Sequence, residues 1–254
     1  MQGNSWRTGL AAWLCALALS ACAGTETGNP SFKGSLGYDA YSSARSVALT
    51  AAPGEPAAEH LRVDSAWLVL GDVELLRADA CAASEGSGEH VHGLGAGDHA
   101  AGQAPATAFD LDAGQYCGVR LPFLHADQLP DGAPESLREE SIALLGRLPD
   151  GRDFELRSAL ETSVLLRAKG SGFALDGEHA GVVIGFDVGA WLDGMEWSAA
   201  QAHAQDGRVL IDAEHNRDFL QRFERALPQG VALFRDADRD GLLDADHTPI
   251  AAAP

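Results

Sequence analysis

Residues 63–76, VDSAWLVLGDVELL, alternate apolar and polar side chains over much of their length. A period of two is typical of a β-strand that buries one face in a core. Gly71 predicts a bulge before the apolar run resumes at Val73. The face predicted to be shared comprises Val63, Ser65, Trp67 and Val69.

The same pattern recurs along the rest of the chain. In residues 115–123, QYCGVRLPF, one face would carry Val119, Leu121 and Phe123 together with Cys117. Turn signals such as Pro149-Asp150-Gly151 separate the candidate strands. Further strands are predicted within 141–148, 152–160, 162–168, 181–188, 207–212 and 230–236.

One helix is predicted late in the chain, at about residues 216–227. Its apolar side chains recur at helical spacing, Asn216 stands at a capping position, and Pro228 with Gly230 would end it. A short second helix is predicted at 189–193. Many short strands and one late helix predict a mainly β fold, an antiparallel β-sandwich with one helix in its C-terminal region, over residues 32–250.

The start of the chain has the layout of an export signal. The apolar run 10–19 follows Arg7 and is too short to span a bilayer as a helix. It ends in Leu-Ser-Ala-Cys at 19–22, which resembles the lipobox of bacterial lipoproteins. The resemblance implies a signal peptide at 1–21 and lipidation of Cys22. The alternative is an ordinary secretory signal in which Cys22 is incidental.

The resemblance also indicates where the protein resides. Ala23, directly after Cys22, favours the outer membrane over the inner membrane. Residues 22–31 are small and polar, which suits a tether between lipid and fold. In an exported, oxidising compartment Cys81 and Cys117 are expected to form a disulfide; two separate buried thiols are the alternative.

The charge of the chain excludes some partners. The sequence has 18 Lys and Arg against 37 Asp and Glu, and Arg7 is the single charged residue in 1–21, so the mature charge is 17 − 37 = −20. Such an acidic chain repels phosphate backbones, which makes nucleic acid a poor partner. It also offers no basic patch to anionic lipid, so membrane attachment is expected through the acyl anchor only.

Two further stretches carry a resemblance. The segment TETGNP at 25–30 resembles the one that follows the lipidated cysteine in uncharacterised Gram-negative lipoproteins. The stretches 65–76, 109–123 and 181–188 are similar to a transthyretin-like β-sandwich domain of unknown function in lipoproteins. This resemblance implies a fold and a location and no known activity.

The acidic stretch DADRDGLLDADH at 236–247 indicates calcium binding. Its spacing matches a calcium loop of EF-hand type, with glycine at the sixth position, 241, where such a loop turns sharply. The twelfth position departs from the pattern, because His247 stands where a bidentate acid belongs. A weak structural site is therefore expected, and a solvated acidic turn is the alternative. The predicted calcium ligands are Asp236, Asp238, Asp240, the carbonyl of Leu242, and Asp244.

The stretch EHVHGLGAGDH at 89–99 is the second candidate metal site. Imidazole and carboxylate together suit Zn²⁺ or Cu²⁺. The candidate ligands are His90, His92, Asp98 and His99, and a polar surface loop is the alternative. The aromatic stretch 191–197 is expected either to line a groove or to close the core.

No catalytic triad or acid–base pair is evident, so the protein is expected not to be an enzyme. The sequence predicts a lipid-anchored, periplasm-facing outer-membrane lipoprotein that binds an unknown envelope protein or small ligand and carries a structural calcium ion. The alternative function is a lipoprotein that handles Zn²⁺ or Cu²⁺ with residues 89–99.

Overall fold

The computed structural model describes residues 31–44, 46–49, 60–78, 88–91, 95–100, 107–203, 205–243 and 248–254. Ser31–Pro254 form one compact unit. Within these ranges, no helix has the length and apolar character needed to cross a membrane.

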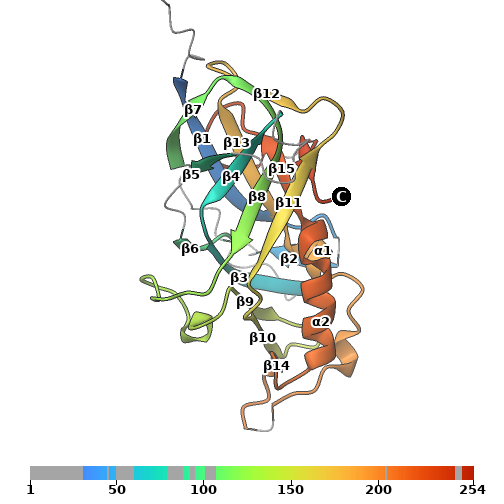
Figure 1. Ribbon diagram of the computed structural model, residues 1–254. Coiled ribbons are helices and arrows are strands. Elements are labelled where there is room, and N and C mark those ends of the chain that lie inside the picture. Colours follow the sequence, from blue (N-terminus) through green and yellow to red (C-terminus); the bar gives the residue numbers. More distant parts are fainter. Residues whose placement is uncertain are drawn as a thin grey trace, which may run out of the picture. The chain divides into compact units, whose positions relative to one another are not determined.

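The unit is built mainly from strands (Figure 1). The strands are β1 (Ser31–Tyr41), β2 (Val47–Leu49), β3 (Leu61–Leu70), β4 (Val73–Arg77), β5 (Gly88–Val91), β6 (Gly95–Asp98), β7 (Thr107–Asp112), β8 (Gly114–Phe123), β9 (Ile142–Arg147), β10 (Asp153–Ser158), β11 (Thr162–Ala168), β12 (Phe173–Leu175), β13 (Gly181–Asp187), β14 (Val209–Ile211), β15 (Val231–Arg235) and β16 (Ala251–Ala252). The helices are α1 (Val188–Leu192) and α2 (Arg217–Ala226), with 3₁₀ turns at Glu135–Leu137, Trp197–Ala199 and Leu227–Gly230.

The strands join in one mixed sheet with the order β14-β10-β9-β3-β8-β11-β16-β15-β13-β1-β7. Most neighbours are antiparallel, whereas β1 and β13, β10 and β14, and β2 and β3 pair in parallel. The mainly β prediction is confirmed, and the architecture is consistent with a β-sandwich. Alternation along a single strand reports which face is buried but not the direction of the neighbouring strand, so the parallel pairs were not predicted.

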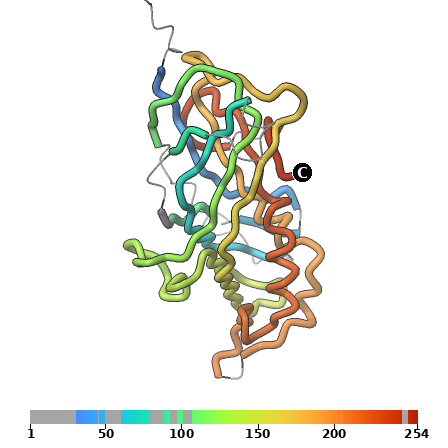
Figure 2. Tube along the Cα trace, in the orientation of Figure 1, coloured from blue at the N-terminus to red at the C-terminus, as the bar shows by residue number. Residues whose placement is uncertain are grey.

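The pairing of β1 with β13 joins the two ends of the described unit. Gly37 lies opposite Val183 and Asp39 opposite Gly185, while β15 flanks β13 on its other edge. Figure 2 shows the blue β1 segment running beside the late, orange and red segments. This corner of the sheet supports the segment that follows β15.

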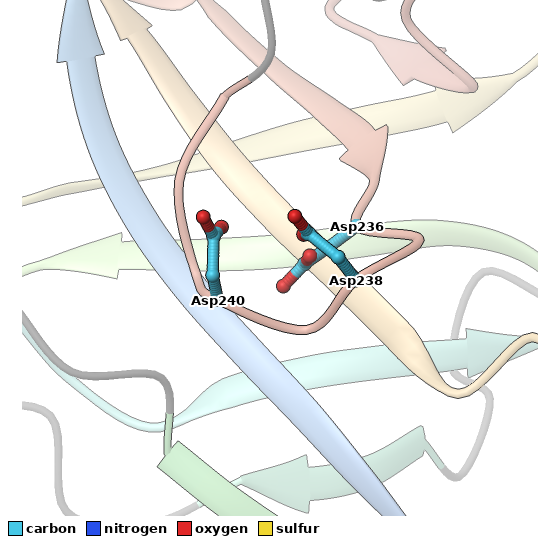
Figure 3. A group of neighbouring side chains, drawn as sticks. All are labelled: Asp236, Asp238 and Asp240. Carbon is cyan, nitrogen blue, oxygen red and sulfur yellow. The ribbon is translucent and has the colours of Figure 1, made fainter.

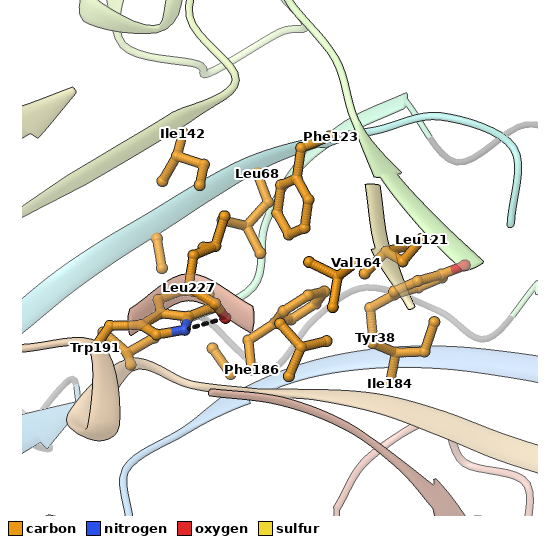
Figure 4. Packing of buried hydrophobic residues seen from close by; sticks show 14 of the residues in the cluster. Tyr38, Leu68, Leu121, Phe123, Ile142, Val164, Ile184, Phe186, Trp191 and Leu227 are labelled. Carbon is orange, nitrogen blue, oxygen red and sulfur yellow. Dashed lines mark hydrogen bonds between the residues drawn. The ribbon is translucent and has the colours of Figure 1, made fainter. Parts of the chain in front are cut away.

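Aromatic side chains from separate elements meet in one hydrophobic core (Figure 4). Phe123 of β8, Phe186 of β13 and Trp191 of α1 are each at most 1 % exposed. The rings of Phe123 and Phe186 meet edge to face with centroids 6.5 Å apart, and those of Phe186 and Trp191 are tilted at 48° with centroids 6.1 Å apart. The indole N–H of Trp191 donates to the carbonyl of Leu227 at 3.0 Å, so its burial leaves no unpaired donor. Residue 191 therefore closes the core instead of lining a groove.

The predicted late helix is confirmed as α2. Leu220 and Phe223 face the interior, and the helix packs against β10, β14 and α1. Asn216 occupies the predicted N-cap position of α2, but its side chain makes no capping hydrogen bond. Asn216 has a left-handed backbone (φ 48°), and its side-chain amide donates to the carbonyls of Gln201 and Leu210 at 2.9 and 2.6 Å. A tertiary contact thus replaces the local cap.

The alternation in 63–76 differs from the prediction at one place. The register between β3 and β9 shifts between Val63 and Ser65, so the irregularity precedes the position predicted at Gly71. After this shift Ala66 and Leu68 point into the core, both fully buried, and Trp67 lies half-buried on the opposite face. Trp67 therefore does not share the face of Val63, because the partner strand β9 sets where the bulge falls.

Candidate metal centre

The acidic loop, defined as residues 236–243, follows β15 and lies over β1 and β13 (Figure 3). Two strand glycines permit this close approach. A Cβ atom at Gly181 would lie 2.1 Å from the carbonyl oxygen of Asp236, and one at Gly37 would lie 2.4 Å from that of Gly241. Because these distances are below van der Waals contact, glycine at both positions lets the loop backbone rest directly on the strands.

Three carboxylates converge in this loop. Asp236, Asp238 and Asp240 each place a carboxylate oxygen within 4.8 Å of the others. The side chain of Asp236 is buried at 3 % exposure, whereas the other two are exposed. Figure 3 shows their oxygens directed into the curve of the loop. Three like charges at this spacing repel one another unless a cation or protons neutralise them.

Backbone amides hold the loop in its curved form. One oxygen of Asp236 accepts the N–H of Arg239 at 2.7 Å, and the other accepts the N–H of Gly241 at 3.0 Å. Arg239 and Gly241 both have positive φ, 63° and 81°. Asp240 accepts the N–H of Leu242 at 2.8 Å. The curved form of the loop is thus held by the carboxylates of Asp236 and Asp240.

Burial and charge disfavour ionisation of one loop carboxyl. Burial raises the pKa of Asp236 above its ordinary value, and Asp238 raises that pKa further. The amides of Gly241 and Arg239 oppose this shift. A bound cation would favour the ionised form of the same group, so protons and cations compete for this loop.

A fourth carboxylate lies beside the loop and was missed by the sequence reasoning. Asp39 of β1 accepts the N–H of Leu243 at 3.0 Å. Burial raises the pKa of Asp39, and the charge of Asp240 adds to the rise. Since 204 residues separate Asp39 from Leu243, no local spacing signals this contact. Of the remaining predicted calcium ligands, Leu242 lies in the loop, and Asp244 lies outside the described residues.

The second candidate stretch, 89–99, is dispersed over two strands. His90 is exposed on β5, opposite Glu74 of β4. Asp98 ends β6, where it pairs with Trp67 of β3. The carboxylate of Asp98 accepts the Ser65 hydroxyl at 2.9 Å and the amides of Ala66 and Ala100 at 2.9 and 3.1 Å. Those oxygens therefore tie the end of β6 to β3.

His99 has turned into the core. Its side chain is 5 % exposed and packs against the rings of Tyr38 and Phe186, at centroid distances of 5.8 and 5.5 Å. Burial lowers the pKa of His99 to about 4, because the charged ring would lose its hydration. The ring is thus neutral in this environment at neutral pH.

These placements correct the prediction of a shared transition-metal site. In the described part of the chain, the one group of three or more acidic, histidine or cysteine side chains close enough to hold an ion is Asp236, Asp238 and Asp240. His90, Asp98 and His99 therefore form no common ligand set, because strand pairing separates residues that are near in sequence. His92 lies outside the described residues.

One cysteine of the predicted disulfide, Cys117, lies among the described residues. Cys117 lies on β8, and its Sγ is 3.1 Å from the carbonyl oxygen of Arg77, at the end of β4. Cys81 and the lipidation residue Cys22 lie outside the described residues. The disulfide and the lipidation remain predictions.

No protein-family model matches the chain, and no curated protein sequence matches it. Among solved structures, the chain is similar to MbnP from Methylosinus trichosporium, with 12 % sequence identity and a TM-score of 0.37. The match covers 69 % of this chain and 82 % of that one. A likeness of this degree carries no argument about function.

Proposed function

We propose that the protein is a lipid-anchored, periplasm-facing lipoprotein of the outer membrane that binds a partner without catalysing a reaction. We further propose that its segment 236–247 binds a structural calcium ion. The Leu-Ser-Ala-Cys motif at 19–22 supports the anchor, and an acidic chain without a basic patch leaves lipid modification as the means of attachment.

The convergence of the three loop carboxylates carries the calcium proposal. Their oxygens lie within 4.8 Å of one another, and the side chains of Asp238 and Asp240 are exposed. Oxygen ligands bound to one Ca²⁺ at about 2.3–2.6 Å lie at most about 5 Å apart. The three carboxylates thus have the spacing of ligands around one ion.

The donor set favours calcium over softer metals. Carboxylate and carbonyl oxygens suit Ca²⁺, whereas Zn²⁺ and Cu²⁺ prefer imidazole and thiolate. His247 in place of a bidentate acid reduces the number of oxygens, so the dissociation constant is expected in the weak extracellular class, on the order of 10⁻⁴–10⁻³ M. The ion would hold the acidic loop on β1 and β13, next to the contact between Asp39 and Leu243.

Thermal unfolding with and without calcium tests this proposal. At a free calcium concentration of ten times Kd, stabilisation is about RT ln 11, or about 1.4 kcal/mol, which raises Tm by a few degrees. Asp240→Ala is expected to abolish that rise. Asp131→Ala, which removes an exposed carboxylate from another turn, is the matched control and keeps it. A calcium-induced rise that survives in Asp240→Ala would contradict the proposal.

Membrane fractionation tests the anchor independently. Cys22→Ser is expected to release the protein from the membrane fraction, since the acyl chains are proposed as its sole attachment. A Cys22→Ser protein that stays with the membrane would contradict the lipoprotein assignment and leave the calcium proposal unaffected.

A further inference from the structure

Two histidines far from the acidic loop face each other beside β14. His203 precedes that strand, and His215 lies between β14 and α2. Their rings are 5.6 Å apart between centroids, with planes inclined at 80°. Strand β14 is at the opposite end of the sheet order from β1, so this pair is separate from the acidic loop.

Each histidine belongs to a tight turn with an aspartate three residues away. Nδ1 of His215 is 2.9 Å from a carboxylate oxygen of Asp212, and Nδ1 of His203 is 3.4 Å from one of Asp206. Asp212 also pairs with Arg157, which keeps its carboxylate anionic. An anionic partner at Nδ1 places the ring proton there and leaves the Nε2 lone pair available.

The two turns are fastened to each other. The side-chain oxygen of Asn216 accepts the N–H of Gln201 at 2.8 Å, and its amide nitrogen donates to the carbonyl of Gln201 at 2.9 Å. The amide of His203 also donates to the carbonyl of Arg208 at 2.7 Å. The Asn216 side chain thus links the segment of His203 to that of His215 through the backbone of Gln201, independently of the two imidazole rings.

The ring separation matches that of two imidazoles on one metal ion. With Zn–N distances of about 2.0–2.1 Å and tetrahedral angles, the centroids of two ligating imidazoles lie about 5–6 Å apart. In both rings the carboxylate contact is made by Nδ1. Nδ1 of His203 is buried without a well-formed hydrogen bond, so a small rotation toward Asp206 would satisfy it.

A contrasting turn in the same chain shows what is special about the pair. His179 and Asp176 form the same contact at the same spacing, with Nδ1 3.1 Å from the carboxylate. An aspartate–histidine turn is therefore a local device that this chain also uses at a solvated site. The second imidazole is the feature that distinguishes His203 and His215.

We propose that His203 and His215 bind Zn²⁺ through their Nε2 atoms, with Asp206 and Asp212 orienting the rings. Two protein ligands leave coordination positions for water, or for an imidazole or carboxylate of a bound partner. This site is independent of the calcium proposal, because its ligands, its metal class and its end of the sheet all differ.

Calorimetric titration of the purified protein with Zn²⁺, in about 10 mM calcium so that the acidic loop is largely occupied, tests the inference. The protein is expected to bind one zinc ion here, and His203→Gln and His215→Gln are each expected to weaken that binding at least tenfold. His179→Gln is the matched control and keeps the original affinity. Thermal unfolding without zinc verifies that each variant is folded.

Asp206→Asn supplies a second variant if a histidine substitution disturbs folding. The carboxylate of Asp206 is half exposed, so its replacement leaves the core intact, and it is expected to weaken zinc binding severalfold. Zinc affinity that is unchanged in both histidine variants, or lost in only one of them, would overturn the shared site.

Discussion

The acidic loop and the stretch 89–99 resemble each other as sequence, yet they have opposite structural outcomes. Both concentrate metal-ligating side chains within about a dozen residues. In the loop the carboxylates of Asp236, Asp238 and Asp240 converge within 4.8 Å. In 89–99, Asp98 lies at the end of β6 beside β3, and the side chain of His99, which follows β6, is buried in the core. A turn curls its side chains around one point, whereas β-pairing distributes them over a sheet.

The largest loss of folding stability is expected for Asp98, whose carboxylate holds two strands together by hydrogen bonds. Asp98→Ala removes the acceptor of the Ser65 hydroxyl and of the Ala66 and Ala100 amides. Losing these partners in a half-buried site is expected to lower the free energy of unfolding by about 3 kcal/mol. Urea unfolding measures the loss, and Asp98→Asn, which keeps one carbonyl oxygen, should lose less. Unchanged stability of Asp98→Ala would remove the structural role.

The second prediction concerns the pH dependence that His99 imposes. Burial lowers the pKa of His99 from 6.5 to about 4, so the unfolded chain takes up a proton at a pH where the folded chain does not. Above pH 7 this histidine therefore leaves the free energy of unfolding unchanged. As the pH falls from 6.5 to 4, the free energy of unfolding decreases progressively, by about 3 kcal/mol in total.

Urea unfolding measured between pH 7 and pH 4 tests whether the free energy of unfolding decreases as the pH falls. His99→Phe keeps an aromatic ring against Tyr38 and Phe186. Over that pH range its free energy of unfolding should fall by about 3 kcal/mol less than that of the wild type. His90→Phe, on the exposed strand β5, should retain the wild-type pH profile. Parallel profiles for the wild type and His99→Phe would show that His99 is not titrating in this way.

The third prediction concerns how the acidic loop rests on the sheet. In Gly37→Ala the new Cβ would lie 2.4 Å from the carbonyl oxygen of Gly241, so the loop must shift. The free energy of unfolding is expected to fall by about 2 kcal/mol, and the calcium-induced rise in Tm is expected to be lost. Gly97→Ala in β6 is the matched control, because its Cβ would meet only the His99 ring at 3.4 Å. Equal calcium responses in the two variants would contradict this placement.

The smallest effect is expected for a loop carboxylate in the absence of calcium. Asp240→Asn removes one of three mutually repelling charges and keeps an oxygen for the Leu242 amide. The variant should be slightly more stable than the wild type in chelator, by up to about 0.5 kcal/mol. Thermal unfolding in chelator provides the comparison, and a clear loss of stability would place Asp240 with Asp98 among the structural carboxylates.

The sequence predicted those features that depend on neighbours along the chain. The alternation of Val119, Leu121 and Phe123 into the core, the helix α2 and the convergence of the loop carboxylates all follow from spacing. The sequence could not indicate the contact of Asp39 with the loop or the bulge at Val63. These features depend on which strands pair, and pairing is set by the whole core.

Calcium stoichiometry, measured by calorimetry, tests the central claim that the acidic loop forms a calcium site. The wild type and His90→Ala are predicted to bind one calcium ion with the same affinity, and Asp238→Asn and Asp240→Asn to bind it at least tenfold more weakly. Full calcium binding by both aspartate variants, or no binding heat for the wild type at up to about 10 mM calcium, would contradict the account.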